Sequence, residues 1–244
     1  IRSVKCILSL LQPAIRSSAP TFEQEQKRNM PDALTRDITI APRHAALVFI
    51  DVQNYAAHPD GGEFKGLSPA EKSKYDYYFE RLESVALPNM QRLQQAARGA
   101  GLEVIYAVIE NLTADGRDRS LDYKISGINV EKGSWDAQVC AAIAPGDDEI
   151  ILRKNSSNVF ISTNIDYLLR SLGMKQVILC GVVTDQCVES AVRDACDLGY
   201  LVTLVPDASA TYTAERQEAS VKAIKGYCRQ ISTEALVAEL RAIR

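Results

Sequence analysis

Short apolar runs separated by helical patterns recur along the chain from residue 45 onward. The runs are rich in Val and Ile and are apolar along their whole length, which predicts strands buried on both faces rather than on one. These runs are the segments 46–50, 103–109, 149–154, 176–182 and 201–207. We therefore expect a β-sheet that is covered on both sides.

Helical patterns occupy stretches between these runs. The segments 87–101, 162–173 and 187–199 each end at a glycine, which is typical of helix C-termini. Strands that alternate with helices predict a single α/β domain with three layers, αβα, around a mostly parallel central sheet. In such sheets ligands bind beyond the carboxyl ends of the strands. The segments 55–80 and 111–135 have no clear periodicity, and we expect them to be loops that shape the ligand site.

Composition excludes several kinds of partner. The 244 residues are 46% hydrophobic and 24% charged, which suits one soluble domain over residues 41–244. A net charge of −3 provides no basic surplus for nucleic acid. No apolar run approaches the roughly 20 residues of a membrane-spanning helix, so we expect no membrane partner. Six cysteines without a Cys-x-x-Cys pair argue against a disulfide framework or a structural zinc site and favour a reducing compartment.

Residues 1–40 are expected to form an N-terminal extension outside the domain. Segment 1–20 contains Arg, Lys and Ser, and no acid precedes Glu23. This composition is shared with organelle transit peptides. The alternatives are sequence upstream of a start at Met30, vector-derived sequence or a plain N-terminal helix. We expect a cytoplasmic protein, or an organellar one if residues 1–29 are a natural transit segment.

Reactive side chains follow three of the predicted strands. Asp51 follows segment 46–50, Lys154 ends segment 149–154, and Cys187 lies in the turn after segment 176–182. Because the carboxyl ends of parallel strands meet at one edge of a sheet, we expect these side chains to lie together. Each alone has an ordinary interpretation: a polar residue leaving a strand, a surface lysine or a small buried hydrophobe. Their coincidence at one edge favours a catalytic site.

A cysteine between a strand and a helix is placed for nucleophilic catalysis. A helix N-terminus and a nearby cation lower a thiol pKa from about 8.5 by one to several units, so we expect a lowered pKa for Cys187, with Lys154 as the cation. Asp51 would accept the thiol proton and return it to a departing amine. Backbone N–H groups of the same turn would stabilise an oxyanion.

Three motifs together resemble the isochorismatase-like cysteine hydrolases over about residues 45–240. They are LVFIDVQN (47–54), EIILRKNSSNVF (149–160) and GVVTDQCVESAVRDACDLGY (181–200). The resemblance implies a triad of Asp51, Lys154 and Cys187, in which the cysteine forms a covalent acyl-enzyme. It also implies a cis peptide bond at Val182–Val183 and an oxyanion hole formed by the amides of Val183 and Cys187.

The same resemblance implies a homo-oligomer, because homo-oligomers are common in that family. The apolar positions of segment 233–243, TEALVAELRAI, are the hint of an interface that the sequence offers.

The resemblance leaves the substrate open. Nicotinamidases of the family carry a metal site with an Asp-x-His pair and a further His, whereas this chain has only His44 and His58 and no Asp-x-His. We therefore expect no metal and no cofactor. Isochorismate-cleaving members can lack the cysteine, so its presence favours C–N bond hydrolysis.

Segment 131–139, EKGSWDAQV, resembles the ureidoacrylate amidohydrolases, which cleave ureido or carbamoyl groups. The expected enzyme is thus a metal-independent cysteine amidohydrolase that acts on a small ureido or carbamoyl amide. The alternatives are a nicotinamidase, an isochorismatase, or a catalytically silent member that binds a ligand or partner through the same pocket.

Four further residues are candidates for substrate binding. Glu110 follows segment 103–109 and could accept hydrogen bonds from a ureido NH₂ group. Tyr55 and Phe160 follow the strands of Asp51 and Lys154 closely and would form walls of the site. Arg117, with Arg119 beside it in the charged segment 113–127, could bind a substrate carboxylate through two parallel hydrogen bonds. The ordinary alternatives are an exposed carboxylate, core aromatic rings and a solvated charge run.

Overall fold

The structure of the chain is a computed structural model that describes residues 35–242. The helices and strands reported below all lie within a compact unit, Arg36–Arg244. The interpretations of residues 1–29 lie outside the described residues, and the domain boundary at residue 40 stays a prediction.

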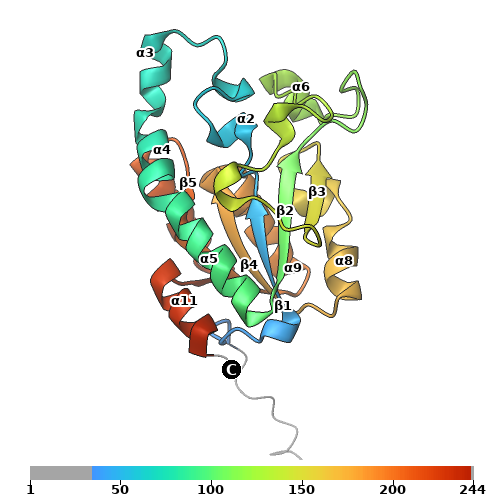
Figure 1. Cartoon of the computed structure of the whole chain (residues 1–244), viewed down its shortest axis with the longest axis vertical. Helices are drawn as coiled ribbons and strands as arrows, with labels where there is room; N and C mark the ends of the chain where they lie inside the picture. Colours follow the sequence, from blue (N-terminus) through green and yellow to red (C-terminus); the bar gives the residue numbers. More distant parts are fainter. Residues whose placement is uncertain (1–34, 243–244) are drawn as a thin grey trace, which may run out of the picture. The chain divides into compact units, whose positions relative to one another are not determined.

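Six parallel strands form one central sheet in the order β3-β2-β1-β4-β5-β6 (Figure 1). The strands are β1 (Ala45–Ile50), β2 (Glu103–Ile109), β3 (Ile150–Lys154), β4 (Gln176–Val182), β5 (Leu201–Ala210) and β6 (Arg229–Gln230). All five predicted strands are present. The sixth strand was missed because it has only two residues, too few to show a pattern.

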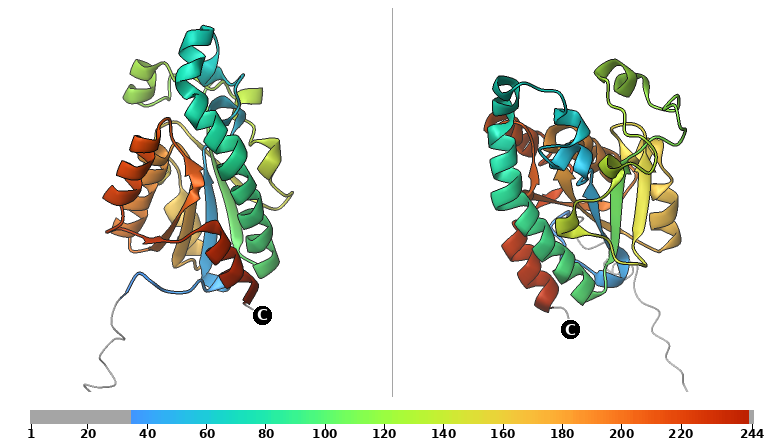
Figure 2. Two further views of the ribbon diagram at one scale, coloured as in Figure 1. Left: turned by 90° about the vertical axis from the view of Figure 1, so that its left-hand side faces the viewer. Right: turned by 45° about the horizontal axis from the view of Figure 1, so that its top comes forward.

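The sheet is covered on both faces, so the three-layer prediction is confirmed. Along β1, alternate residues belong to two separate cores, with Leu47 and Phe49 on one side and Val48 and Ile50 on the other. Figure 2 shows helices α5 (Leu87–Ala100) and α11 (Thr233–Ala242) against one face, and helices α8 (Ile165–Ser171), α9 (Glu189–Asp197) and α10 (Ala214–Ala223) against the other. Burial on both faces explains why the central strand β1 is apolar throughout.

Segment 55–80, expected to be a loop, is largely helical. It contains part of α2 (Asn54–Ala57), followed by η2 (Gly62–Phe64), α3 (Pro69–Lys72), η3 (Ser73–Tyr75) and most of α4 (Asp76–Arg81), which continues through the π-helical turn η4 (Leu82–Ala86) into α5. A local signal was present, because Ser68 and Glu71 form a capping box in which the Ser68 backbone N–H donates to the Glu71 carboxylate at 2.8 Å. The expectation failed because the helical elements of this segment are each only three to six residues long, too short to show a periodic pattern.

The charged segment 113–127 also contains a helix, α6 (Leu121–Ser126), capped by Ser120, whose hydroxyl accepts from the backbone N–H of Tyr123 at 3.2 Å. The remaining short elements are η1 (Pro42–His44), η5 (Trp135–Ala137), η6 (Ala141–Ile143), α7 (Val159–Ser162) and η7 (Thr184–Val188). No helix among those described has both the length and the apolar character needed to cross a bilayer.

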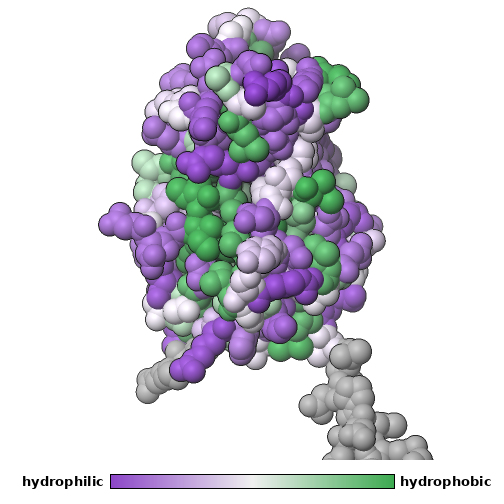
Figure 3. Space-filling model, turned by 90° about the vertical axis from the view of Figure 1, so that its right-hand side faces the viewer, coloured by the Kyte–Doolittle hydropathy of each residue, from purple (hydrophilic) through white to green (hydrophobic). Residues whose placement is uncertain are grey.

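The larger apolar positions of segment 233–242, suggested as the hint of an interface, are buried within the chain. Residues 233–242 form α11, whose Leu236, Val237 and Leu240 lie in the same core as α5. These positions are apolar because they complete the fold of their own chain. Exposed apolar side chains gather instead on the face where β3 and α8 lie (Figure 3), and oligomerisation stays a prediction.

Candidate active site

The three reactive side chains predicted from the sequence lie together at the carboxyl edge of the sheet. Asp51 directly follows β1, Lys154 is the last residue of β3, and Cys187 belongs to the turn η7 after β4. The Nζ atom of Lys154 lies 2.9 Å from Oδ2 of Asp51 and 3.6 Å from Sγ of Cys187. All three side chains are buried. An acid, an ammonium and a thiol therefore share one site that is shielded from water.

Lys154 is held in place by three oxygen atoms. Besides Asp51, its ammonium donates to the carbonyl oxygen of Ser156 at 2.8 Å and to the hydroxyl of Tyr123 at 3.0 Å. Burial lowers the pKa of Lys154, but the interactions with Asp51, Cys187 and Tyr123 together raise it by more, and the net shift is upward. The side chain therefore stays charged. Sequence reasoning missed Tyr123, because it lies in a segment that was read as a loop.

Asp51 adopts a backbone conformation that turns the chain sharply at the end of β1. Its φ of +54° is the only positive φ outside glycine among the described residues. The conformation brings the carboxylate to Lys154, while the Asp51 N–H still donates to the carbonyl of Ala107 on β2 at 2.9 Å. Burial raises the pKa of Asp51, and the charge of Lys154 opposes the shift. A carboxyl group with a raised pKa is suited to accept a proton and return it.

The expected low pKa of Cys187 is wrong. Burial raises the pKa of the thiol to about 12; the charge of Lys154 opposes this shift and that of Asp51 adds to it. The sequence indicated a helix start and a lysine, but not that the lysine would pair with Asp51 while the thiol is enclosed. Cys187 therefore rests as a thiol beside a carboxylate rather than as a thiolate.

The chain between β4 and η7 contains the cis peptide bond that the resemblance implied, at Val182–Val183. Just before it, Gly181 has a φ of +134°, and a Cβ atom there would lie only 2.2 Å from the carbonyl oxygen of Ile50. Only glycine allows β4 to approach β1 this closely. This close approach places the turn of Cys187 beside Asp51.

A cavity of about 780 Å³ opens over these side chains. This size suits a small-molecule site. Asp51, Val183 and Cys187 form its floor with other residues from the strand ends, and the elements α2, η2 and α6 supply its walls. Its polar lining also includes Glu63, Asp122, Gln186, Tyr75, Tyr123 and Tyr212.

Only one of the four predicted substrate-binding residues, Tyr55, lines this cavity. The carboxylate of Glu110 accepts from the backbone N–H of Gly133 at 2.9 Å and pairs with Arg153 at 2.6 Å, so both of its oxygens already have protein partners. Glu110 therefore fixes a loop instead of facing a substrate.

The other two residues also lie elsewhere. Phe160 belongs to the core beneath α8 and α9, where its ring is 6.2 Å from that of Tyr200. Arg117 is largely exposed and pairs with Asp115 at 3.0 Å. Neither Phe160 nor Arg117 lines the cavity, so the roles suggested for them are corrected.

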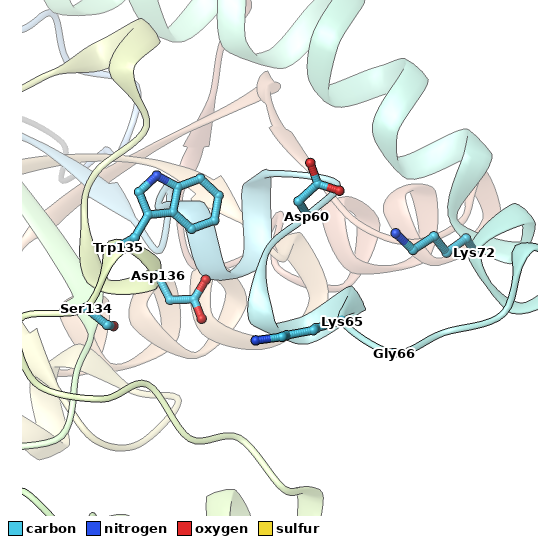
Figure 4. Close-up of a pocket in the computed structure, with 7 residues that line it drawn as sticks. All are labelled: Asp60, Lys65, Gly66, Lys72, Ser134, Trp135 and Asp136. Carbon is cyan, nitrogen blue, oxygen red and sulfur yellow. The ribbon is translucent and has the colours of Figure 1, made fainter.

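Segment 131–139 supports the wall of the cavity. Oδ1 of Asp136 accepts from the backbone N–H of Gly62 at 3.1 Å, and the carbonyl of Trp135 accepts from the Asn54 side chain at 2.9 Å. These bonds fix α2 and η2. Trp135 and Asp136 also line a second, more open cavity of about 460 Å³, in which Asp136 and Lys65 point toward one another (Figure 4). No member of the Asp51–Lys154–Cys187 cluster lines this second cavity.

A second carboxyl group in the main cavity, that of Glu63 in η2, was not foreseen. It accepts a short hydrogen bond from the hydroxyl of Tyr212, the second residue after β5. Burial raises the pKa of Glu63 to about 7; the bond from Tyr212 opposes this shift and repulsion from Asp51 adds to it. Among the described residues, no group of three or more His, Cys, Asp and Glu side chains is arranged to hold a metal ion.

The parallel αβα sheet, with a thiol and a carboxylate facing a small-molecule cavity at its carboxyl edge, has the architecture of a hydrolase. The Isochorismatase domain model matches residues 45–235, and the chain belongs to this family. The resemblance stated from the sequence is thereby confirmed, and with it the prediction of a hydrolase.

Individual relatives agree with this assignment. The chain is 29% identical to a ureidoacrylate amidohydrolase RutB from Enterobacter sp. (strain 638), over 81% of this chain and 89% of the relative. It is 26% identical to the RutB of Rhizobium rhizogenes, over 87% of this chain and 93% of that relative. Among solved structures, a cysteine hydrolase from Pseudomonas syringae pv. phaseolicola has the same fold, with a TM-score of 0.72 and 23% identity over 85% of this chain and 97% of that chain. The N-carbamoylsarcosine amidase from Thermoplasma acidophilum also has this fold, with a TM-score of 0.61 and 23% identity over 78% of this chain and 96% of that chain.

Proposed function

We propose that this chain is a metal-independent cysteine amidohydrolase that cleaves a C–N bond of a small ureido or carbamoyl compound. The observation that carries the proposal is the cluster at the cavity floor, where the Lys154 ammonium lies 2.9 Å from Asp51 and 3.6 Å from the thiol of Cys187. The relatives support the substrate class, because ureidoacrylate contains a ureido group and N-carbamoylsarcosine a carbamoyl group.

In the first half-reaction Cys187 attacks the substrate carbonyl. Since its pKa is raised, the thiol transfers its proton to Asp51 as the C–S bond forms. The carbonyl oxygen becomes an oxyanion, which the backbone amides of Val183 and Cys187 would stabilise by about 3 kcal/mol per donor. Protonated Asp51 then returns the proton to the nitrogen, the C–N bond breaks, and an amine or ammonia leaves behind a thioester.

In the second half-reaction water attacks the thioester carbonyl while Asp51 accepts a proton from the water. The C–S bond breaks and the thiol of Cys187 takes a proton back, so the enzyme is regenerated. A carbamoyl thioester releases carbamate, which decomposes to carbon dioxide and an amine or ammonia. Lys154 keeps Asp51 ionised and oriented at the start of both halves, because its ammonium lies 2.9 Å from Oδ2.

The decisive assay is ammonia release from ureidoacrylate, biuret, N-carbamoyl amino acids and nicotinamide, with a chelator present. We expect release from at least one ureido or carbamoyl compound, and we expect it to be unaffected by the chelator. Cys187→Ala should lose the activity. The matched control is Cys196→Ala, because Cys196 is only half-buried and does not line the cavity.

Each alternative has its own outcome in this assay. Release from nicotinamide alone, or loss of activity with the chelator, would identify a nicotinamidase or a metal enzyme. Cleavage of isochorismate, tested as a separate substrate, with no ammonia release from the panel would identify an isochorismatase. Activity that survives in Cys187→Ala would refute the covalent mechanism, and failure of Cys187 to react with any electrophile would favour a binding protein.

A further inference from the structure

The main cavity has an unbalanced charge. Three of its lining residues are acids, namely Asp51, Glu63 and Asp122, and none is Lys, Arg or His. Lys154 lies below the floor with no exposed surface, and its ammonium already contacts Asp51, Tyr123 and Ser156. A substrate carboxylate in this cavity would lose its hydration shell without gaining a cation from the described residues, which is unfavourable.

Arg216 lies beside Tyr212, which lines the cavity, but it has a carboxylate partner of its own. Arg216 stacks on the ring of Tyr212 with its Cζ 4.9 Å from the ring centroid, and its Nε is paired with Asp185. Neither Arg216 nor Asp185 lines the cavity. Arg117, the residue that the sequence suggested for binding a carboxylate, pairs with Asp115 and lies outside the cavity as well.

Glu63 is held rigidly in the cavity wall. The Tyr212 hydroxyl donates to its Oε1, and the Tyr212 ring packs edge-on against Tyr75 and Tyr78, with centroids 5.4 Å away in both cases. The backbone N–H of Gly62, the residue before Glu63, donates to the side-chain carboxylate of Asp136 at 3.1 Å. The second oxygen of Glu63 remains an acceptor for a ligand, since a carboxylate has about four acceptor positions.

We propose that Glu63, positioned by Tyr212, determines substrate specificity by accepting a hydrogen bond from an N–H donor at the end of the substrate remote from the scissile carbonyl. The preferred substrate is a ureido or carbamoyl compound that carries an amide NH₂ or an ammonium group there. Compounds with a carboxylate at that end, such as ureidoacrylate or N-carbamoylsarcosine, are poor substrates. This inference rests on the proposed function and narrows its substrate class.

The charge of Glu63 depends on its surroundings. The titratable groups that interact with it are Asp51 after β1, Tyr55 in α2, Tyr78 in α4 and Tyr212 after β5. Because the pKa of Glu63 is raised to about 7, the test is best made near pH 8, where the carboxylate form predominates.

The test compares three compounds of similar size that differ only at the remote end: (2-aminoethyl)urea, propylurea and N-carbamoylglycine, which are cationic, neutral and anionic. Wild-type enzyme should give kcat/KM at least roughly tenfold higher for the cation than for the anion. Glu63→Gln, which keeps the shape and removes the charge, should reduce this ratio by roughly fivefold or more. The control is Glu83→Gln, because Glu83 is an exposed carboxylate in η4 that does not line the cavity.

A second readout does not require turnover. Cys187 is labelled with 2-aminoethyl and 2-sulfonatoethyl methanethiosulfonate, and each rate is divided by the rate with a free small thiol. The labelling is followed by the intact mass of the protein. Subtracting the labelling of the Cys187→Ala variant gives the rate at Cys187 alone. The cationic reagent should react faster than the anionic one, and Glu63→Gln should diminish the difference.

These outcomes separate the two proposals. If Cys187 reacts, but the anionic compounds do as well as the cationic ones or Glu63→Gln leaves the ratio unchanged, the role of Glu63 is refuted and the amidohydrolase stands. If no compound is hydrolysed, the labelling ratio alone decides the role of Glu63. If Cys187 neither reacts nor supports hydrolysis, the proposed function falls, and this inference falls with it.

Discussion

Lys154→Met tests the electrostatic arrangement of the site through stability rather than activity. Methionine has a similar length but no charge, so Asp51 would remain with 1% of its surface exposed and without a cation. Breaking a buried ion pair by removing one partner costs about 3–5 kcal/mol. The hydroxyl of Tyr123 and the carbonyl of Ser156 also lose their contacts with the ammonium. We therefore expect the free energy of unfolding to fall by about 3–5 kcal/mol near pH 8.

The loss should depend on pH in a defined direction. The pKa of Asp51 is already raised in the folded chain, and removal of the ammonium raises it further. A carboxyl group whose folded pKa is raised contributes stability that is complete below its unfolded pKa of about 4 and is lost as the pH rises through the folded pKa. The difference between wild type and Lys154→Met should therefore grow from about pH 5 to about pH 8.

Urea unfolding of the wild type, Lys154→Met, Asp51→Asn and the double variant measures these quantities at one fixed protein concentration. The double variant should be more stable than the sum of the single losses predicts, by about 2–3 kcal/mol, because it leaves no unpaired charge. A coupling energy below about 0.5 kcal/mol, or a loss that shrinks as the pH rises, would refute the reasoning.

Two further predictions concern the strand β4 and the turn that follows it. Gly181→Ala should lower the free energy of unfolding by more than about 2 kcal/mol, because the new Cβ would lie 2.2 Å from the Ile50 carbonyl oxygen. The control is Gly99→Ala in α5, where a Cβ meets nothing within 4 Å, and it should be neutral or stabilising. Thermal melts of both variants measure the difference. Alkylation of Cys187 by iodoacetamide should still accelerate at about pH 10, because burial raises the thiol pKa to about 12. A plateau near pH 8 would instead indicate a resting thiolate.

The sequence was sufficient for the sheet and for the cluster at its edge, for a simple physical reason. A strand such as β1 that is buried on both faces must be apolar at every position, so the first charged residue after it, Asp51, marks the end of the strand. Lys154 and Cys187 are placed more loosely, because Lys154 is the last residue of the partly exposed strand β3 and Cys187 lies in the turn after the fully buried strand β4. Neighbouring parallel strands then place those ends side by side without any information about loops.

The pattern of a single strand could not predict how the side chains at that edge pair. Glu110 does lie at the end of β2, but the adjacent strand presents both Arg153 and Lys154, and Arg153 takes its carboxylate. The prediction of a lowered pKa for Cys187 failed for a similar reason. The direction of the pKa shift depends on how closely the walls of the cavity enclose the thiol. Those walls come from segments in which the sequence shows no periodicity.

The proposed substrate selection depends on a pairing that is still more distant in the sequence. Glu63 and Tyr212 are 149 residues apart, and only the closed fold brings them together. In the proposed mechanism the ammonium of Lys154 keeps Asp51 ionised. An ammonium that is buried against one carboxylate leaves no positive charge for a second. Any anionic substrate of this fold must therefore find its cation in the walls. Since the described walls of this chain offer Glu63 instead, the same argument that explains the catalytic cluster also predicts a substrate with a neutral or positive remote end.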